Sequence, residues 1–204
     1  SSETGSGIVI NDESIINSSA GAIDIIGVSY LSEPGVKIVG GSSLDSSGGD
    51  IFMLGVSDQI GVNLYDIDLI SSGTGNVKIV GVGNDSYGVL MQEGGKITST
   101  TGSVTAIAAD TYTYDSTDYT GSSKYGVELS SFGGIETGGG AITFTGAGTS
   151  LGVILLKTSI TSGEGKVTFN GTATTGSGVL LEQEVSLTST SGDIAFTGKS
   201  TDSY

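Results

Sequence analysis

The chain has 204 residues, 36 of them glycine, and 22 acidic residues outweigh seven lysines to give a formal net charge of −15. It contains no cysteine, histidine, tryptophan or arginine, which excludes imidazole triads, thiol nucleophiles and zinc sites built on nitrogen or sulfur ligands. The acidic balance predicts that neither nucleic acid nor an anionic membrane surface is a partner, and no apolar run is long enough for membrane insertion.

A step of glycine followed by Val or Ile recurs at intervals of 28, 26, 27, 38, 26 and 26 residues. Two further patterns keep pace with it: apolar-x-Ser/Thr, as in residues 16–18, and Gly-x-apolar, as in residues 21–23. The steps begin at Gly7, Gly35, Gly61, Gly88, Gly126, Gly152 and Gly178. A fixed period of this length is the signature of a solenoid.

Each copy holds three short segments in which apolar and polar residues alternate, such as residues 89–91, 97–99 and 104–106 of the fourth copy. Alternation over so few residues indicates half-buried strands, and the Gly, Ser, Asn and Asp between them favour turns. Three strands per copy predict an all-β, three-sided parallel β-solenoid (a single-stranded β-helix) of about seven coils. It forms a single domain over residues 1–204.

Aligning the copies gives four apolar columns that we expect to point inward and stack into one core. The first runs Ile8, Val36, Val62, Val89, Val127, Val153, Val179, and the second Ile10, Ile38, Leu64, Met91, Leu129, Leu155, Leu181. The third runs Ile23, Ile51, Val77, Val104, Ile142, Val167, Ile194, and the fourth Ile25, Met53, Ile79, Ala106, Phe144, Phe169, Phe196.

A column of hydroxyl residues is expected to lie inside as well, each bonding either its neighbour or the corner backbone. It comprises Ser18, Ser46, Ser72, Ser99, Thr137, Ser162 and Ser189. The outward position of the first strand is apolar at Leu90, Ile154 and Leu180. We interpret these three as scattered exposed residues; the alternative is a face that meets another chain or loop.

The repeat resembles the coils of filamentous haemagglutinin-like bacterial exoproteins, most clearly at residues 139–146 and 163–171. The resemblance covers essentially the whole chain and implies a right-handed β-helical shaft of a long, two-partner-secreted or autotransporter-type adhesin. It implies a secreted or cell-surface location at the bacterial outer membrane and a role in cell adhesion. The chain is then expected to be an interior or C-terminal piece, with neighbouring coils of the same long chain as partners.

The fourth copy departs from the pattern. Eighteen residues separate Ala108 from Gly126, against 6–8 at the same place in other copies, so a loop insertion lies at about 109–125. Loops on rigid scaffolds often carry recognition, and tyrosine suits binding surfaces. The candidate ligand-binding residues, for a glycan or host surface protein, are Tyr112, Tyr114, Asp115, Asp118 and Tyr119. The alternative is a surface excursion that packs its tyrosines on the rod.

Other kinds of site are less favoured. Asp110, Asp115 and Asp118 are weak calcium candidates, and otherwise no cofactor or metal is expected. Parallel β-helices also serve polysaccharide lyases and hydrolases, which need a strong base or convergent carboxylates. Here Asp45, Glu128 and Glu136 are scattered over different columns and coils. We therefore expect no enzyme and no catalytic residue, a structural shaft first and a binding module second, with some self-association through exposed coil ends.

Overall fold

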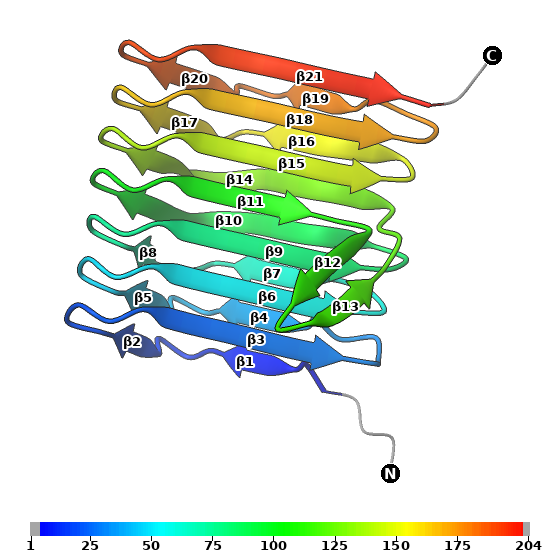
Figure 1. Ribbon diagram of the computed structural model, residues 1–204, viewed down its shortest axis with the longest axis horizontal. Helices are drawn as coiled ribbons and strands as arrows, with labels where there is room; N and C mark the ends of the chain where they lie inside the picture. The colour runs from blue at the N-terminus through cyan, green and yellow to red at the C-terminus, as the bar shows by residue number, and fades with distance from the viewer. Residues whose placement is uncertain (1–4, 202–204) are drawn as a thin grey trace.

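The computed structural model describes residues 5–201, which fold into seven stacked coils of parallel β-strand (Figure 1). None of residues 5–201 is helical. The predicted β-solenoid is confirmed. Coil 1 contains β1 to β3, coil 2 β4 to β6, coil 3 β7 to β9, coil 4 β10 and β11, coil 5 β14 and β15, coil 6 β16 to β18, and coil 7 β19 to β21.

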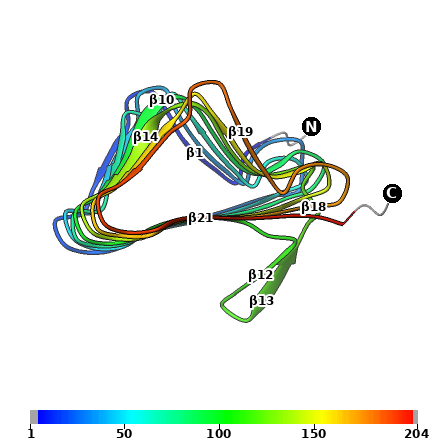
Figure 2. The ribbon, with the colours of Figure 1, turned by 90° about the horizontal axis from the view of Figure 1, so that it is seen from above.

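Seen from above, the coils superpose on one three-sided outline (Figure 2). The first side contains β1 (Ile8–Ile10), β4 (Val36–Val39), β7 (Val62–Tyr65), the start of β10 (Tyr87–Ser99), the start of β14 (Tyr125–Thr137), β16 (Leu151–Leu156) and β19 (Val179–Glu182). The second contains β2 (Ile15–Asn17), β5 (Ser43–Asp45), β8 (Leu69–Ser71), the ends of β10 and β14, β17 (Ser159–Ser162) and β20 (Ser186–Ser189).

The third side is a seven-stranded sheet, nearly straight in Figure 2. It contains β3 (Ile23–Ser29), β6 (Ile51–Ser57), β9 (Val77–Gly83), β11 (Val104–Ala108), β15 (Ile142–Gly148), β18 (Val167–Ala173) and β21 (Ile194–Ser200). Between coils 4 and 5 the chain leaves the solenoid to form β12 (Thr111–Tyr114) and β13 (Thr117–Thr120). These two strands lie within the predicted insertion.

The backbone pairing follows the predicted columns residue by residue. Val36 pairs with Val62 on the first side, and Phe144 pairs with Phe169 on the third. Every inward apolar residue of coils 2 to 6 is at most 1% exposed. Like side chains therefore stack on like through the rod, and each coil buries the core surface of the next.

The hydroxyl column lies inside the corner between the second and third sides. Ser99 donates to the carbonyl oxygen of Gly75 at 2.9 Å, and Ser162 donates to that of Gly165 at 2.7 Å. The sequence predicts two kinds of hydrogen-bond partner for these hydroxyl groups, and the corner backbone is the more frequent one. Thr137 also donates to the Ser162 hydroxyl at 3.4 Å. These bonds satisfy carbonyl groups that a turn inside an apolar core would leave unpaired.

Glycine pairs allow the backbones of the first and third sides to approach closely where the two sides converge. A Cβ on Gly55 would lie far inside the van der Waals distance of the Gly61 carbonyl oxygen, and Gly81 meets Gly88 in the same way. The two backbones approach so closely that no side chain fits between them. Coil 4 has Ala108 at this position, and it is the coil after which the chain departs into β12 and β13.

Candidate functional site

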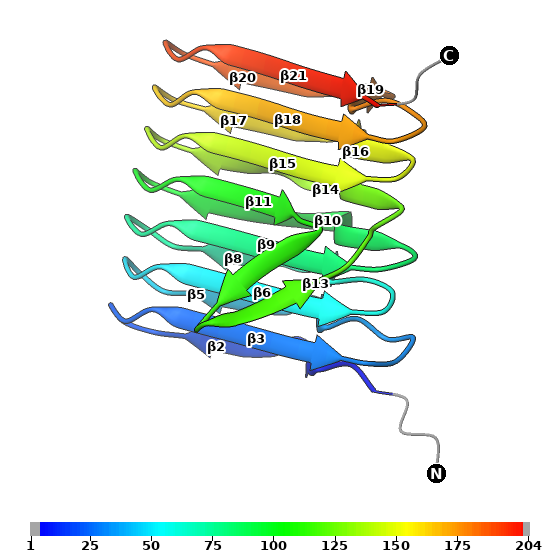
Figure 3. The same ribbon diagram turned by 45° about the vertical axis from the view of Figure 1, so that its right-hand side comes forward.

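The insertion forms an antiparallel β-hairpin that slants back over the third side (Figures 1 and 3). Its two turn residues, Asp115 and Ser116, have φ angles of 46° and 62°. Positive φ at both central residues is typical of the type I′ turn, whose twist matches that of the two strands it joins. Asp adopts positive φ more readily than most residues. The hairpin therefore has a defined geometry from its own local sequence.

One face of the hairpin is aromatic and packs on the rod. Tyr112 and Tyr114 lie on the same face because they are two residues apart, and Tyr119 joins them because it pairs directly with Tyr112. Tyr114 stacks on Phe52 with 5.4 Å between ring centroids. Lys78 donates to the Tyr112 hydroxyl at 2.9 Å, and its ammonium group lies 5.2 Å from the Tyr112 ring centroid and 5.9 Å from that of Phe52.

The strands that the hairpin crosses carry apolar side chains on their outer face. Leu54 and Val80 alternate with inward residues and so point outward, yet both are 0% exposed. Val82, two residues beyond Val80, is also fully buried and faces the base of the hairpin at Gly121. In coils 5 to 7 the matching positions are polar or small. The hairpin thus covers an apolar strip that is restricted to neighbouring coils.

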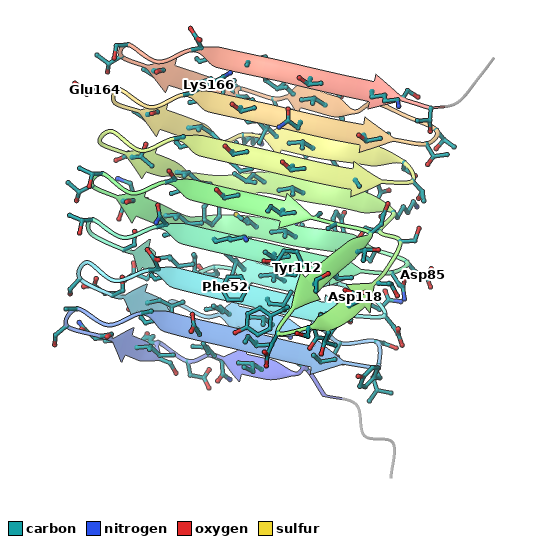
Figure 4. The ribbon with its side chains drawn as sticks, in the orientation of Figure 1. Phe52, Asp85, Tyr112, Asp118, Glu164 and Lys166 are labelled. Atoms are coloured by element: carbon teal, nitrogen blue, oxygen red, sulfur yellow. The ribbon has the colours of Figure 1, made fainter. Side chains whose placement is uncertain are left out.

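The other face of the hairpin is polar and points to solvent. It carries Thr111, Thr113, Asp118 and Thr120, all exposed, and the Thr113 hydroxyl donates to the Asp118 carboxylate. Figure 4 shows Tyr112 beside Phe52 and Asp118 on the neighbouring strand. The five candidate ligand-binding residues therefore do not converge. Three half-buried tyrosines contact or face the rod, Asp118 lies on the outer face, and Asp115 lies at the tip.

We expect Tyr114→Ala to lower the free energy of unfolding by about 1–2 kcal/mol, because it removes an aromatic stack and uncovers apolar surface. Thr111→Ala, on the exposed face of the same strand, is the matched control and should change it by less than about 0.5 kcal/mol. Urea unfolding followed by circular dichroism measures both. Equal effects would show that the aromatic face does not hold the hairpin down.

The weak calcium candidates are not brought together. Within residues 5–201, no three His, Cys, Asp or Glu side chains lie close enough to share an ion. Asp110, Asp115 and Asp118 therefore do not form such a group. Neither do Glu13, Asp66 and Asp68, although they line one surface hollow at the corner between the first and second sides.

A second cluster lies on the outer surface of the first side, where the interpretation of scattered exposed residues was wrong for Leu90 and Ile154, while Leu180 is half-buried. Leu90 is 5% exposed and Ile154 is 2% exposed, and between them in the same outward column Glu128 is 8% exposed. Tyr87 and Tyr125 stack beside this column with ring centroids 4.8 Å apart, and the Tyr87 side chain lies next to Glu128. Two tyrosines at matching positions in adjacent copies were the available sequence signal.

Burial changes the acidity of this cluster. Desolvation raises the pKa of Glu128 above its usual value, and the hydrogen bond from Tyr87 offsets part of that rise. The pKa of Tyr87 rises to about 12, chiefly through burial and then through the charge of Glu128. The folded chain therefore binds the Glu128 proton more tightly than the unfolded chain does, so stability falls as pH rises from the usual carboxyl range through the raised pKa.

We expect Glu128→Gln to raise the free energy of unfolding by about 1 kcal/mol near pH 7.5, because the amide has no charge to desolvate. Near pH 4 the gain should disappear, since the carboxyl group is then largely neutral in both states. Glu136→Gln is the control, because Glu136 is exposed and pairs only with Lys96 at 2.8 Å. Urea titrations at both pH values measure the effect; a gain that is the same at both would contradict it.

Comparison with family models, curated proteins and solved structures found no match. Along the part of the chain that the structure describes, there is no helix of the length and apolarity that spanning a membrane requires. The class that the fold defines is a parallel β-solenoid repeat protein.

Proposed function

We propose that this chain is a rigid structural shaft segment of a secreted or cell-surface bacterial exoprotein, similar in role to the shafts of haemagglutinin-like adhesins. One observation carries the proposal. The inward columns of five consecutive coils are almost completely buried and paired in register. A continuous core of this kind resists bending and extends without limit by adding coils. The resemblance of the repeat to exoprotein shafts supports the location and the link to adhesion.

The hairpin fits the same role as a brace. It starts after coil 4 and contacts Phe52 of coil 2 and Lys78 of coil 3, so it ties three coils together on one side. Tyr114 and Tyr112 make these two contacts. A glycan or host protein would meet the outer face instead, where Thr113 and Asp118 lie. The second candidate, a recognition module, therefore rests on different residues from those that the tyrosine-rich sequence suggests.

The test is a screen of glycans and extracellular-matrix proteins with the intact chain beside a Thr113→Ala, Asp118→Ala variant. This variant leaves the packed tyrosine face unchanged, so it separates recognition from folding. The shaft proposal expects no ligand for either protein. A ligand that binds the intact chain and is lost in the variant would replace the shaft with the recognition module.

A mechanical measurement tests the shaft directly. The chain is held by both ends and stretched while the force is recorded. A shaft should unfold in a single event at high force, because its coils share one core. Gradual yielding at low force, coil by coil, would contradict the proposal.

A further inference from the structure

The hairpin is joined to the rod by side chains rather than by strand pairing. Its strands β12 and β13 pair only with each other and form a separate two-stranded sheet. Among the described residues, no backbone hydrogen bond joins residues 111–120 to a strand of a coil. The joining contacts come from side chains, namely the hydrogen bond from Lys78 to the Tyr112 hydroxyl and the stack of Tyr114 on Phe52.

The hairpin is not part of the core. Every residue from 111 to 120 is exposed or half-buried, and the buried apolar cluster of the rod includes none of them. An isolated two-stranded hairpin is marginally stable in water, so docking on the rod is what orders this element. A few surface contacts therefore set the free energy of opening, which lies well below that of unfolding the coils.

The surface beneath the hairpin differs from the one that the hairpin presents to solvent. Leu54 and Val80 lie in one outward column and are fully buried, whereas Ile26 and Ile107, the next residues of that column on either side, are half-buried. Full burial in this column is thus limited to coils 2 and 3, over which the hairpin lies (Figure 3). Lifting the hairpin would expose the apolar strip formed by Leu54, Val80 and Val82.

The base of the hairpin is anchored separately. The Ala109 N–H group donates to the carbonyl oxygen of Gly81 at 3.2 Å, and the Ser122 N–H group donates to the side-chain oxygen of Asn84 at 2.9 Å. Both bonds lie just outside the two strands. The hairpin can therefore turn away about the short segments between these bonds and the strands, as a hinge of a few residues at the ends of an element.

We propose that the hairpin is a strap that opens and closes on the third side while the seven coils stay folded. The closed strap presents threonines and Asp118 and joins coils 2 to 4, and the open strap uncovers the apolar strip. The rod thus has two surfaces at this place, one polar and one apolar, in a proportion that the docking contacts of Tyr112 and Tyr114 determine. This inference goes beyond the shaft role, because a rod with a permanently fixed hairpin would serve equally well as a shaft.

A single introduced thiol can report the opening, because the chain has no cysteine. Leu54→Cys places the thiol under the strap, and Met53→Cys places it inside the rod, one residue away on β6; both native side chains are 0% exposed. Reaction with a water-soluble aromatic disulfide is followed under native conditions. We expect Leu54→Cys to react at least about 100-fold faster, because it needs only the strap to open. Equal rates would mean that the strap opens only when the coils unfold, and would overturn the proposal.

Low concentrations of urea separate the two routes, because the urea dependence of an opening scales with the surface that it exposes. The Leu54→Cys rate should change little below the unfolding transition, whereas the Met53→Cys rate should rise steeply. Adding Tyr114→Ala to Leu54→Cys should speed the reaction by about tenfold with the same shallow urea dependence. Thr111→Ala, on the exposed face of the same strand, should leave the rate unchanged. An equal increase from both substitutions, or none from Tyr114→Ala, contradicts the strap.

Hydrogen exchange of the unsubstituted chain gives a second test that does not depend on the folding of any variant. The amide hydrogens of residues 111–120 should exchange by a route that is almost independent of urea at low concentration, because the lifted hairpin is marginally stable. Those of β9, beneath the strap, should exchange by a route that accelerates steeply with urea. The same urea dependence in both segments would refute the proposal, whatever the cysteine variants do.

Discussion

Gly55→Ala is expected to lower the free energy of unfolding by more than about 3 kcal/mol and the melting temperature by about 10 °C, or to prevent soluble expression altogether. The added Cβ would overlap the Gly61 carbonyl group, which is backbone and is fixed by its own hydrogen bonding to the neighbouring coil. Relief requires the first and third sides to separate. Separation at one coil also breaks register with the coils above and below, because the interior is close-packed.

Gly139→Ala is the matched control. No heavy atom lies within 4 Å of the Cβ that this substitution would add, and Gly139 does not have a positive φ. Its effect should stay within about 0.5 kcal/mol. Thermal melts and urea titrations of both variants give the comparison. Similar stabilities for the two variants would mean that the contact between the sides can open at little cost.

Phe169→Ala should cost about 3–5 kcal/mol of unfolding free energy. Phe169 is fully buried and stacks on both Phe144 and Phe196, so its loss leaves a cavity between two rings that neighbouring coils hold apart. Collapse into that cavity is restricted by the fixed spacing of paired strands on the third side. The same urea titrations measure this loss.

Phe196→Ala tests the explanation with the same residue type in the same column. Phe196 is 48% exposed and, among the described residues, stacks on Phe169 alone, so less apolar surface leaves the core and no enclosed cavity forms. The loss should be less than half that of Phe169→Ala. Equal losses would indicate that stacking alone, and not burial between coils, determines the stability of the column.

The candidate site was only partly accessible from the sequence. The length and place of the insertion were clear, because Ala108 and Gly126 stand 18 residues apart in an otherwise regular repeat. The direction in which its tyrosines point could not be predicted from the sequence. The outward apolar residues Leu54 and Val80 were the signal that something covers the third side of coils 2 and 3, since the matching third-side positions in coils 5 to 7 are Thr145, Asn170 and Thr197.

The cluster around Glu128 could not be derived by alternation either. Alternation assigns Leu90, Glu128 and Ile154 to the outside of the first side, but it contains no information about which side chains cover that outside. The convergence of the first and third sides, set by glycine pairs such as Gly55 and Gly61, gives the rod an outline that is not a simple triangle (Figure 2).

The sequence by itself determined the period, the strand order within a coil and the identity of the inward columns. It could do so because a repeat that buries nothing alone must place equivalent residues at equivalent positions in every coil. Only the tertiary structure decided what the irregular parts do: the hairpin folded back on coils 2 and 3, and Glu128 buried beside Tyr87. These contacts join residues that do not occupy equivalent positions of the repeat, such as Phe52 of β6 and Tyr114 of the insertion, and nothing in the spacing of a repeat fixes such a pairing.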